Sequence, residues 1–145
     1  MNNESKIDRV YIRKEDKKVY DKLQDEDPTS PFFERENREV YMVALARGFI
    51  DGERLGLNNR EGFIRLATLK SKDKAIIKAI AVQEEETLGI LGDKEKVYKI
   101  ANEYAAGGLQ LLKERVLKQN IGSYVKRLES ELIETFDNSK VFIRD

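Results

Sequence analysis

The sequence has no cysteine and no histidine among its 145 residues. Without cysteine there is no disulfide, no thiolate nucleophile, no zinc–thiolate site and no iron–sulfur cluster. Without histidine there is no imidazole base or imidazole metal ligand, and a Ser-His-Asp triad is excluded. Carboxylates and lysines are the catalytic groups that are left. We therefore expect a protein that is not an enzyme and that has no metal site and no cofactor.

The chain also lacks net charge and long apolar runs. Its 27 basic and 27 acidic residues cancel, so any attraction to nucleic acid must come from local clusters. No apolar run approaches the length of about 18 residues that a membrane span needs, and the start MNNESKIDR is too polar for a secretory signal. We expect a cytoplasmic protein without membrane contact. Apolar residues make up 40% of the chain, enough for one globular domain.

Proline is rare, and both prolines stand in the segment PTSP at 28–31. This segment should end a first helix over 14–27. Before it, the alternation in RVYIR (9–13) predicts a short strand, and residues 1–8 read as a frayed terminus. KVFIR (140–144) echoes RVYIR, so two short terminal strands are expected to pair within one chain or between protomers.

The middle of the chain reads as two helices joined by a glycine-rich loop. The first begins with Asn37 as N-cap and ends with Gly48 as a left-handed C-cap. After the loop, FIRLATL (63–69) fits either a small strand or the approach to a helix. Ser71 then caps a second helix that runs to about Glu85.

Two more helices complete the pattern. Asp93 caps a long helix in which AAGG (105–108) predicts a kink or a close contact with a neighbouring helix. The last helix spans 121–137 and carries an apolar seam suited to packing or to a partner helix. The seam residues predicted to bind a partner are Ile121, Val125, Leu128 and Leu132. The fold class that follows is mainly α, one compact domain over 9–145 with about five helices and short terminal strands.

Three patterns suggest chemistry but have simpler explanations. The glycines at 48, 52 and 56 match neither the Walker A nor the dinucleotide fingerprint, so turn geometry is favoured over phosphate binding. Ser71 and Lys74 match a Ser-x-x-Lys nucleophile motif, but its companion elements are missing. The acidic runs at 84–86 and 93–95 could in principle hold magnesium, but solvated helix ends are the favoured explanation in a chain this charged.

A local excess of basic residues is the feature that favours a function. Between 47 and 78 there are eight basic residues against four acidic ones. Lys70, Lys74 and Lys78 recur every four residues and so share one face of a helix. Contact with nucleic-acid phosphates needs only lysine and arginine in suitable places; a solvated, lysine-rich face is the alternative. The residues predicted to bind nucleic acid are Arg47, Arg54, Arg60, Arg65, Lys70, Lys74 and Lys78.

Three segments of the chain, 38–57, 72–82 and 100–114, resemble a known family. It comprises small accessory proteins encoded beside DNA phosphorothioation (Dnd) gene clusters and is called Dnd system-associated protein four. The resemblance covers most of 9–135 and includes a Gly-x-Arg loop (Gly52, Arg54). It also includes an EYA-x-GG element, formed by Glu103, Tyr104, Ala105, Gly107 and Gly108. The resemblance implies a prokaryotic antiviral-defence setting in which a DNA backbone is marked with sulphur, but it supplies no catalytic residue.

Two functional hypotheses follow from the sequence. The first is a noncatalytic accessory subunit that binds the DNA backbone, without sequence preference, through the basic run 47–78. The alternative is an adaptor that bridges larger nuclease, ATPase or modification subunits through the helical seam and the terminal strands, in which case homo-oligomers are also expected.

Overall fold

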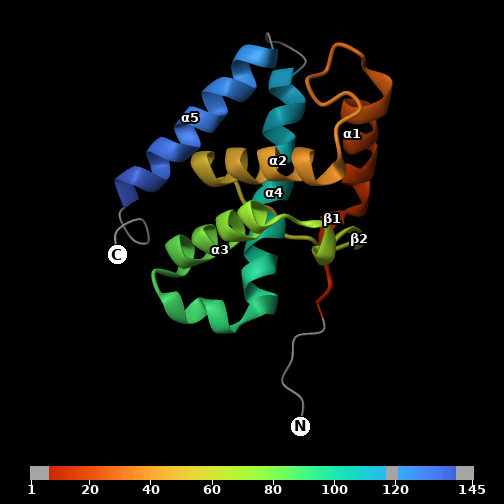
Figure 1. Ribbon diagram of the computed structural model, residues 1–145. Helices are drawn as coiled ribbons and strands as arrows, with labels where there is room; N and C mark the ends of the chain where they lie inside the picture. Colours follow the sequence, from red (N-terminus) through yellow and green to blue (C-terminus); the bar gives the residue numbers. More distant parts are fainter. Residues whose placement is uncertain (1–6, 117–120, 140–145) are drawn as a thin grey trace.

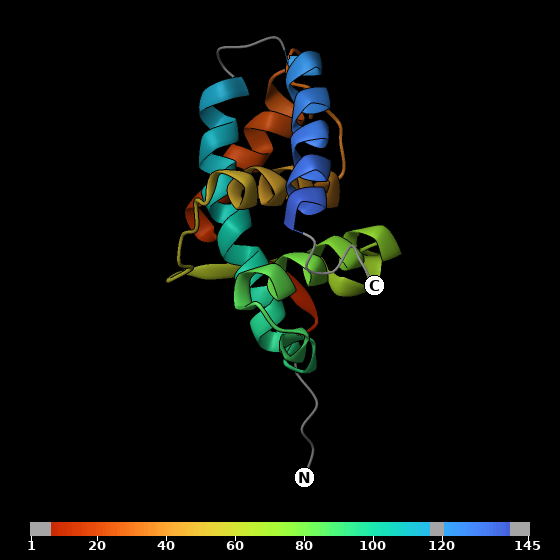
Figure 2. The ribbon, with the colours of Figure 1, turned by 90° about the vertical axis from the view of Figure 1, so that its left-hand side faces the viewer.

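The long helix α4 (Lys94–Val116) runs through the centre of the molecule, and the other elements pack around it (Figure 1). The structure is a computed structural model that describes residues 7–116 and 121–139, with the side chains of its last helix described from 125 to 138. Helix α5 (Ile121–Ser139) lies toward the C-terminal end of α4, whereas α3 (Ser71–Glu85) and the 3-10 segment η4 (Leu88–Gly92) lie toward its N-terminal end (Figures 1 and 2). The predicted mainly α, single-domain fold is confirmed, with five α-helices within the described ranges.

Helix α2 (Asn37–Asp51) crosses α4 so closely that backbone meets backbone (Figure 1). A Cβ atom added at Gly48 would lie 2.0 Å from the carbonyl oxygen of Tyr104, and one at Gly108 would lie 1.7 Å from that of Ala44. Only glycine fits at these two positions, because real Cβ atoms do not approach backbone atoms this closely. AAGG therefore makes the close helix contact that was one of its two predicted roles.

The same crossing corrects the predicted end of α2. Gly48 was predicted to be a left-handed C-cap, but it lies inside the helix, which continues to Asp51. Gly52 takes the cap position with φ of 70°, and its N–H donates to the carbonyls of Gly48 and Phe49. The N-caps also move by one residue, since Asn37 and Ser71 are the first helical residues and Glu36 and Lys70 are the caps.

The predicted helix at 14–27 is a succession of three short turns. A 3-10 turn (Lys14–Asp16), helix α1 (Lys17–Asp21) and a π-helical turn (Lys22–Glu26) follow one another without a break. Asp16 is buried at their start, where it accepts bidentate hydrogen bonds from Arg13 and a third from Gln110 on α4. These charge-assisted bonds fix the first helical segment to the centre of the fold.

Strand β1 (Arg9–Arg13) pairs antiparallel with β2 (Arg60–Arg65), which makes a two-stranded sheet. The alternative of a strand within 63–69 is therefore partly correct, because β2 starts earlier and a 3-10 turn (Leu66–Thr68) follows it. Strand 140–144, predicted to pair with β1, lies outside the described residues. So do residues 1–6 of the predicted frayed terminus, whereas Ile7 packs against the core.

Helix α5 uses its apolar seam within the chain. Leu128 is only 3% exposed, and Val125 packs against the core. The ring of Phe136 stacks on that of Phe49 from α2 at a centroid distance of 5.8 Å. Leu128 is therefore not available to a partner helix, contrary to its predicted role. Leu132 is half-buried, and the side chain of Ile121 lies outside the described residues.

Candidate nucleic-acid interface

The basic residues predicted to bind nucleic acid are treated differently by the fold, and Arg47 is removed from the surface altogether. It is 2% exposed and pairs with Asp51 on its own helix and with Glu131 of α5, whose carboxylate lies 3.1 Å from Nη2. An Arg47 guanidinium held in this way cannot reach a phosphate. The prediction for Arg47 is wrong because α5, which covers it, is more than 70 residues further along the chain.

Arg54 is at the surface but its charge is neutralised. Its guanidinium donates to Glu84 of α3 at 2.6 Å and to Glu103 of α4 at 2.7 Å, and it lies 5.5 Å from the ring centroid of Tyr104. Burial alone would lower the pKa of Arg54, but the hydrogen bond to Glu103 and the two carboxylate charges raise it overall. Arg54 therefore ties the loop after α2 to two helices, and two carboxylates face one cation.

Arg60 is also engaged, at the wall of a surface groove. Its guanidinium stacks 4.1 Å from the ring centroid of Tyr11. The groove has a volume of about 580 Å³ and mixes both signs of charge. Its charged lining residues are Arg60, Asp93, Glu95, Lys96, Lys99 and Glu103. Because the charges balance, this groove offers no net attraction to a polyanion.

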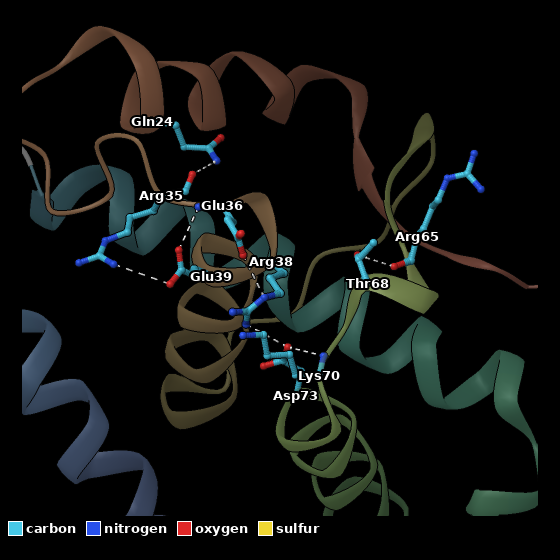
Figure 3. A network of polar contacts seen from close by, with 9 residues as sticks. All are labelled: Gln24, Arg35, Glu36, Arg38, Glu39, Arg65, Thr68, Lys70 and Asp73. Atoms are coloured by element: carbon cyan, nitrogen blue, oxygen red, sulfur yellow. Dashed lines mark hydrogen bonds and ion pairs between the residues drawn. The ribbon is translucent and has the colours of Figure 1, made fainter.

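The N-terminus of α3 is held in place by a polar network that includes α2 (Figure 3). Asp73 accepts a hydrogen bond from Nη1 of Arg38 at 3.1 Å and one from the backbone N–H of Lys70 at 2.9 Å. The carboxylate thus caps α3 and pairs with a cation of α2 at the same time. Arg65 stands at the entrance to this segment, and its side chain points away from the network in Figure 3. The network fixes the direction in which α3 presents its lysines.

A second, smaller groove between α3, η4 and α4 carries positive charge alone. It has a volume of about 280 Å³, and we refer to it as the lysine groove. Its lining residues are Leu66, Lys74, Lys78, Leu91, Lys94, Val97 and Tyr98. No carboxylate belongs to this lining. Within residues 7–116 and 121–139, no hydrogen bond or ion pair engages the ammonium groups of Lys74, Lys78 or Lys94.

The apolar part of the lysine groove comes from residues that sequence reasoning did not select. Val97 and Tyr98 are buried, and Leu91 is 43% exposed at the rim. Tyr98 is 4% exposed, burial raises the pKa of its hydroxyl, and this hydroxyl has no hydrogen-bond partner within the described residues. Lys94 was also missed, because it stands between two acidic residues in DKE. It is the first residue of α4 and lies with Lys74 and Lys78 of α3 in the groove lining.

The acidic runs are used for structural contacts. Glu84 accepts from Arg54 and from the Tyr104 hydroxyl, Glu85 pairs with Lys96, and Asp93 accepts from the backbone N–H of Lys96. Across the described ranges, no group of three or more acidic side chains is arranged to hold a metal ion. No helix in those ranges is long and apolar enough to cross a membrane.

Comparison with known protein families shows to which family the chain belongs. The family described as DNA sulphur modification system-associated protein 4 matches residues 9–141. The chain belongs to this family. No curated protein and no solved structure matches it. Membership of the DNA sulphur modification system-associated protein 4 family connects the chain to a system that modifies DNA with sulphur, as its resemblance to the Dnd-associated proteins implied.

Proposed function

We propose that this protein is a noncatalytic accessory subunit of a DNA phosphorothioation-linked defence system and that it binds the DNA backbone through α3 and the lysine groove. The observation that carries the proposal is a groove lined by Lys74, Lys78 and Lys94, whose ammonium groups form no ion pair within the described residues. Arg65 and Lys70 precede α3 in the chain and likewise form no ion pair with the described part of the molecule. Arg47 and Arg54 are not part of this face, because carboxylates already neutralise them.

The spacing on α3 suits a repeating polyanion. Lys74 and Lys78 lie four residues apart on α3, which places their Cα atoms roughly 6 Å apart along one side of the helix, and Lys70 is the N-cap residue directly before the first turn. Like charges at this spacing repel each other slightly. The repulsion is relieved when phosphates approach and condensed counterions leave the DNA, so binding is favoured most at low salt.

The test is DNA binding by a triple variant, Lys70→Gln, Lys74→Gln and Lys78→Gln, measured by fluorescence anisotropy on a short duplex over a range of salt concentrations. Losing three phosphate contacts should reduce the slope of log K against log salt by about 2.7 and weaken binding on the order of 10- to 100-fold at low salt. The matched control replaces three lysines that line a separate small groove, in the variant Lys18→Gln, Lys22→Gln and Lys113→Gln.

The control variant carries the same net charge as the triple variant and should bind DNA nearly as well as the unsubstituted protein. Equal weakening by both variants would mean that only net charge matters, and no binding of duplex at low salt would refute the proposal.

A second function is favoured by Leu88, which is exposed on η4 beside the lysine groove. An adaptor would bind larger subunits of the system through this apolar site. In a pull-down, those subunits would then remain bound after nuclease digestion, and they would also bind the triple variant.

A further inference from the structure

The lysine groove combines positive charge with an apolar wall, and the binding of an ordinary phosphate does not require the apolar wall. Its cations attract any phosphodiester, but its remaining lining is Leu66, Leu91, Val97 and the ring of Tyr98. A phosphate oxygen pressed against these groups would lose water without gaining a hydrogen bond in return. Only the Tyr98 hydroxyl and the three ammonium groups offer donors there.

A phosphorothioate fits this lining better. It keeps the single negative charge of a phosphodiester, but sulphur replaces one non-bridging oxygen. Sulphur is larger, more polarisable and more weakly hydrated than oxygen, so it loses less when it leaves water for an apolar wall. The other non-bridging oxygen remains free to accept from Lys74, Lys78 or Lys94 at the rim.

We infer that the lysine groove is a binding site for a sulphur-modified phosphate of the DNA backbone, with the sulphur against Leu91 and Val97 and the remaining oxygen toward the lysines. This inference rests on the proposed binding of DNA. It assigns general affinity to the three lysines and discrimination between sulphur and oxygen to the apolar wall. The two parts of the groove can therefore be separated by substitution.

The experiment compares three duplexes of one sequence: unmodified, and with one sulphur at either of the two non-bridging positions of a single phosphate. Only one of the two positions can direct sulphur to the apolar wall while oxygen faces the lysines. We expect that duplex to bind about fivefold more tightly than the unmodified one, from the burial of one sulphur atom. The other modified duplex should bind like unmodified DNA.

Two variants locate the effect in the groove. Leu91→Asn changes an exposed side chain at the rim and should abolish the preference for sulphur while binding of unmodified DNA stays within about twofold. Lys78→Gln should weaken the binding of all three duplexes by the same factor and leave the preference intact. Circular dichroism of each variant confirms the fold.

The outcomes distinguish this inference from the proposed function. Binding of all duplexes with equal affinity and a clear effect of Lys78→Gln would overturn the sulphur inference alone. A preference that survives Leu91→Asn would overturn the assignment to this groove. Absence of binding to every duplex at low salt would overturn both the inference and the proposed function.

Discussion

The substitution Gly108→Ala should break the packing on which the whole fold depends. Its new Cβ would lie 1.7 Å from the carbonyl oxygen of Ala44 and 2.6 Å from the backbone nitrogen of Gly48, whereas an ordinary Cβ contact is at 3.4 Å or beyond. Both obstacles are backbone atoms of α2, so no side-chain rotation relieves the clash. The helices must move apart by about 1 Å or more, and such a gap forfeits about half or more of each dispersion contact across the crossing.

The expected loss in the free energy of unfolding is about 3 kcal/mol, at the upper end of the range for overpacked cores. This net loss already includes the higher helix propensity of alanine, which alone would add about 1 kcal/mol to the free energy of unfolding. Urea unfolding followed by circular dichroism measures the difference. Gly56→Ala is the control, because nothing lies within 4 Å of its Cβ position, and its effect should stay within about 0.5 kcal/mol. A Gly108→Ala protein as stable as this control would refute the backbone contact.

Two further predictions concern buried polar groups. Asn102, which is 4% exposed, accepts from the Tyr41 hydroxyl at 2.8 Å and from the Tyr11 amide at 3.2 Å, so Asn102→Ala should lower the free energy of unfolding by about 2–4 kcal/mol. In a Tyr41→Phe background the same substitution should cost at least about 1 kcal/mol less, and additive effects in this double-mutant cycle would contradict the bond. Burial, followed by the hydrogen bond to Glu84, raises the pKa of Tyr104 to about 12. The stabilising contribution of Tyr104 is therefore complete below pH 10 and is lost as the pH rises through 12. Urea unfolding at successive pH values should show the free energy of unfolding falling over this interval, and falling less in Tyr104→Phe. A spectrophotometric titration in which Tyr104 ionises near pH 10 in the folded protein would contradict the raised pKa.

Much of the helical framework was predictable because it depends on neighbouring residues. The apolar spacing and the N-cap predicted at Ser71 place α3 within one residue of its observed bounds, and Asp93 places the start of α4. The end of α2 was not predictable in the same way. A glycine letter is compatible with a left-handed cap or with close helix packing, and the reason for Gly48 lies at Tyr104 and Gly108 in a distant helix.

The candidate site shows the same division. Lys74 and Lys78 of the four-residue repeat form one wall of the lysine groove, and the sequence identifies them because helical periodicity fixes a shared face. The opposite wall, with Lys94 and Tyr98, comes from another helix and depends on tertiary packing. Arg54 failed as a free cation for a related reason: the carboxylates that neutralise it are 30 and 49 residues further along the chain.

The crossing of α2 and α4 also bears on how this family can change over time. It is a contact between main chains, so its one requirement at Gly48 and Gly108 is the absence of a side chain. The outer face of α3 takes no part in that contact, and its lysines are joined to the rest of the molecule by the Asp73 cap rather than by their own side chains. Mutation can therefore exchange the charges of α3 while the scaffold stays intact, and relatives that keep the two glycines are free to diverge in what they bind.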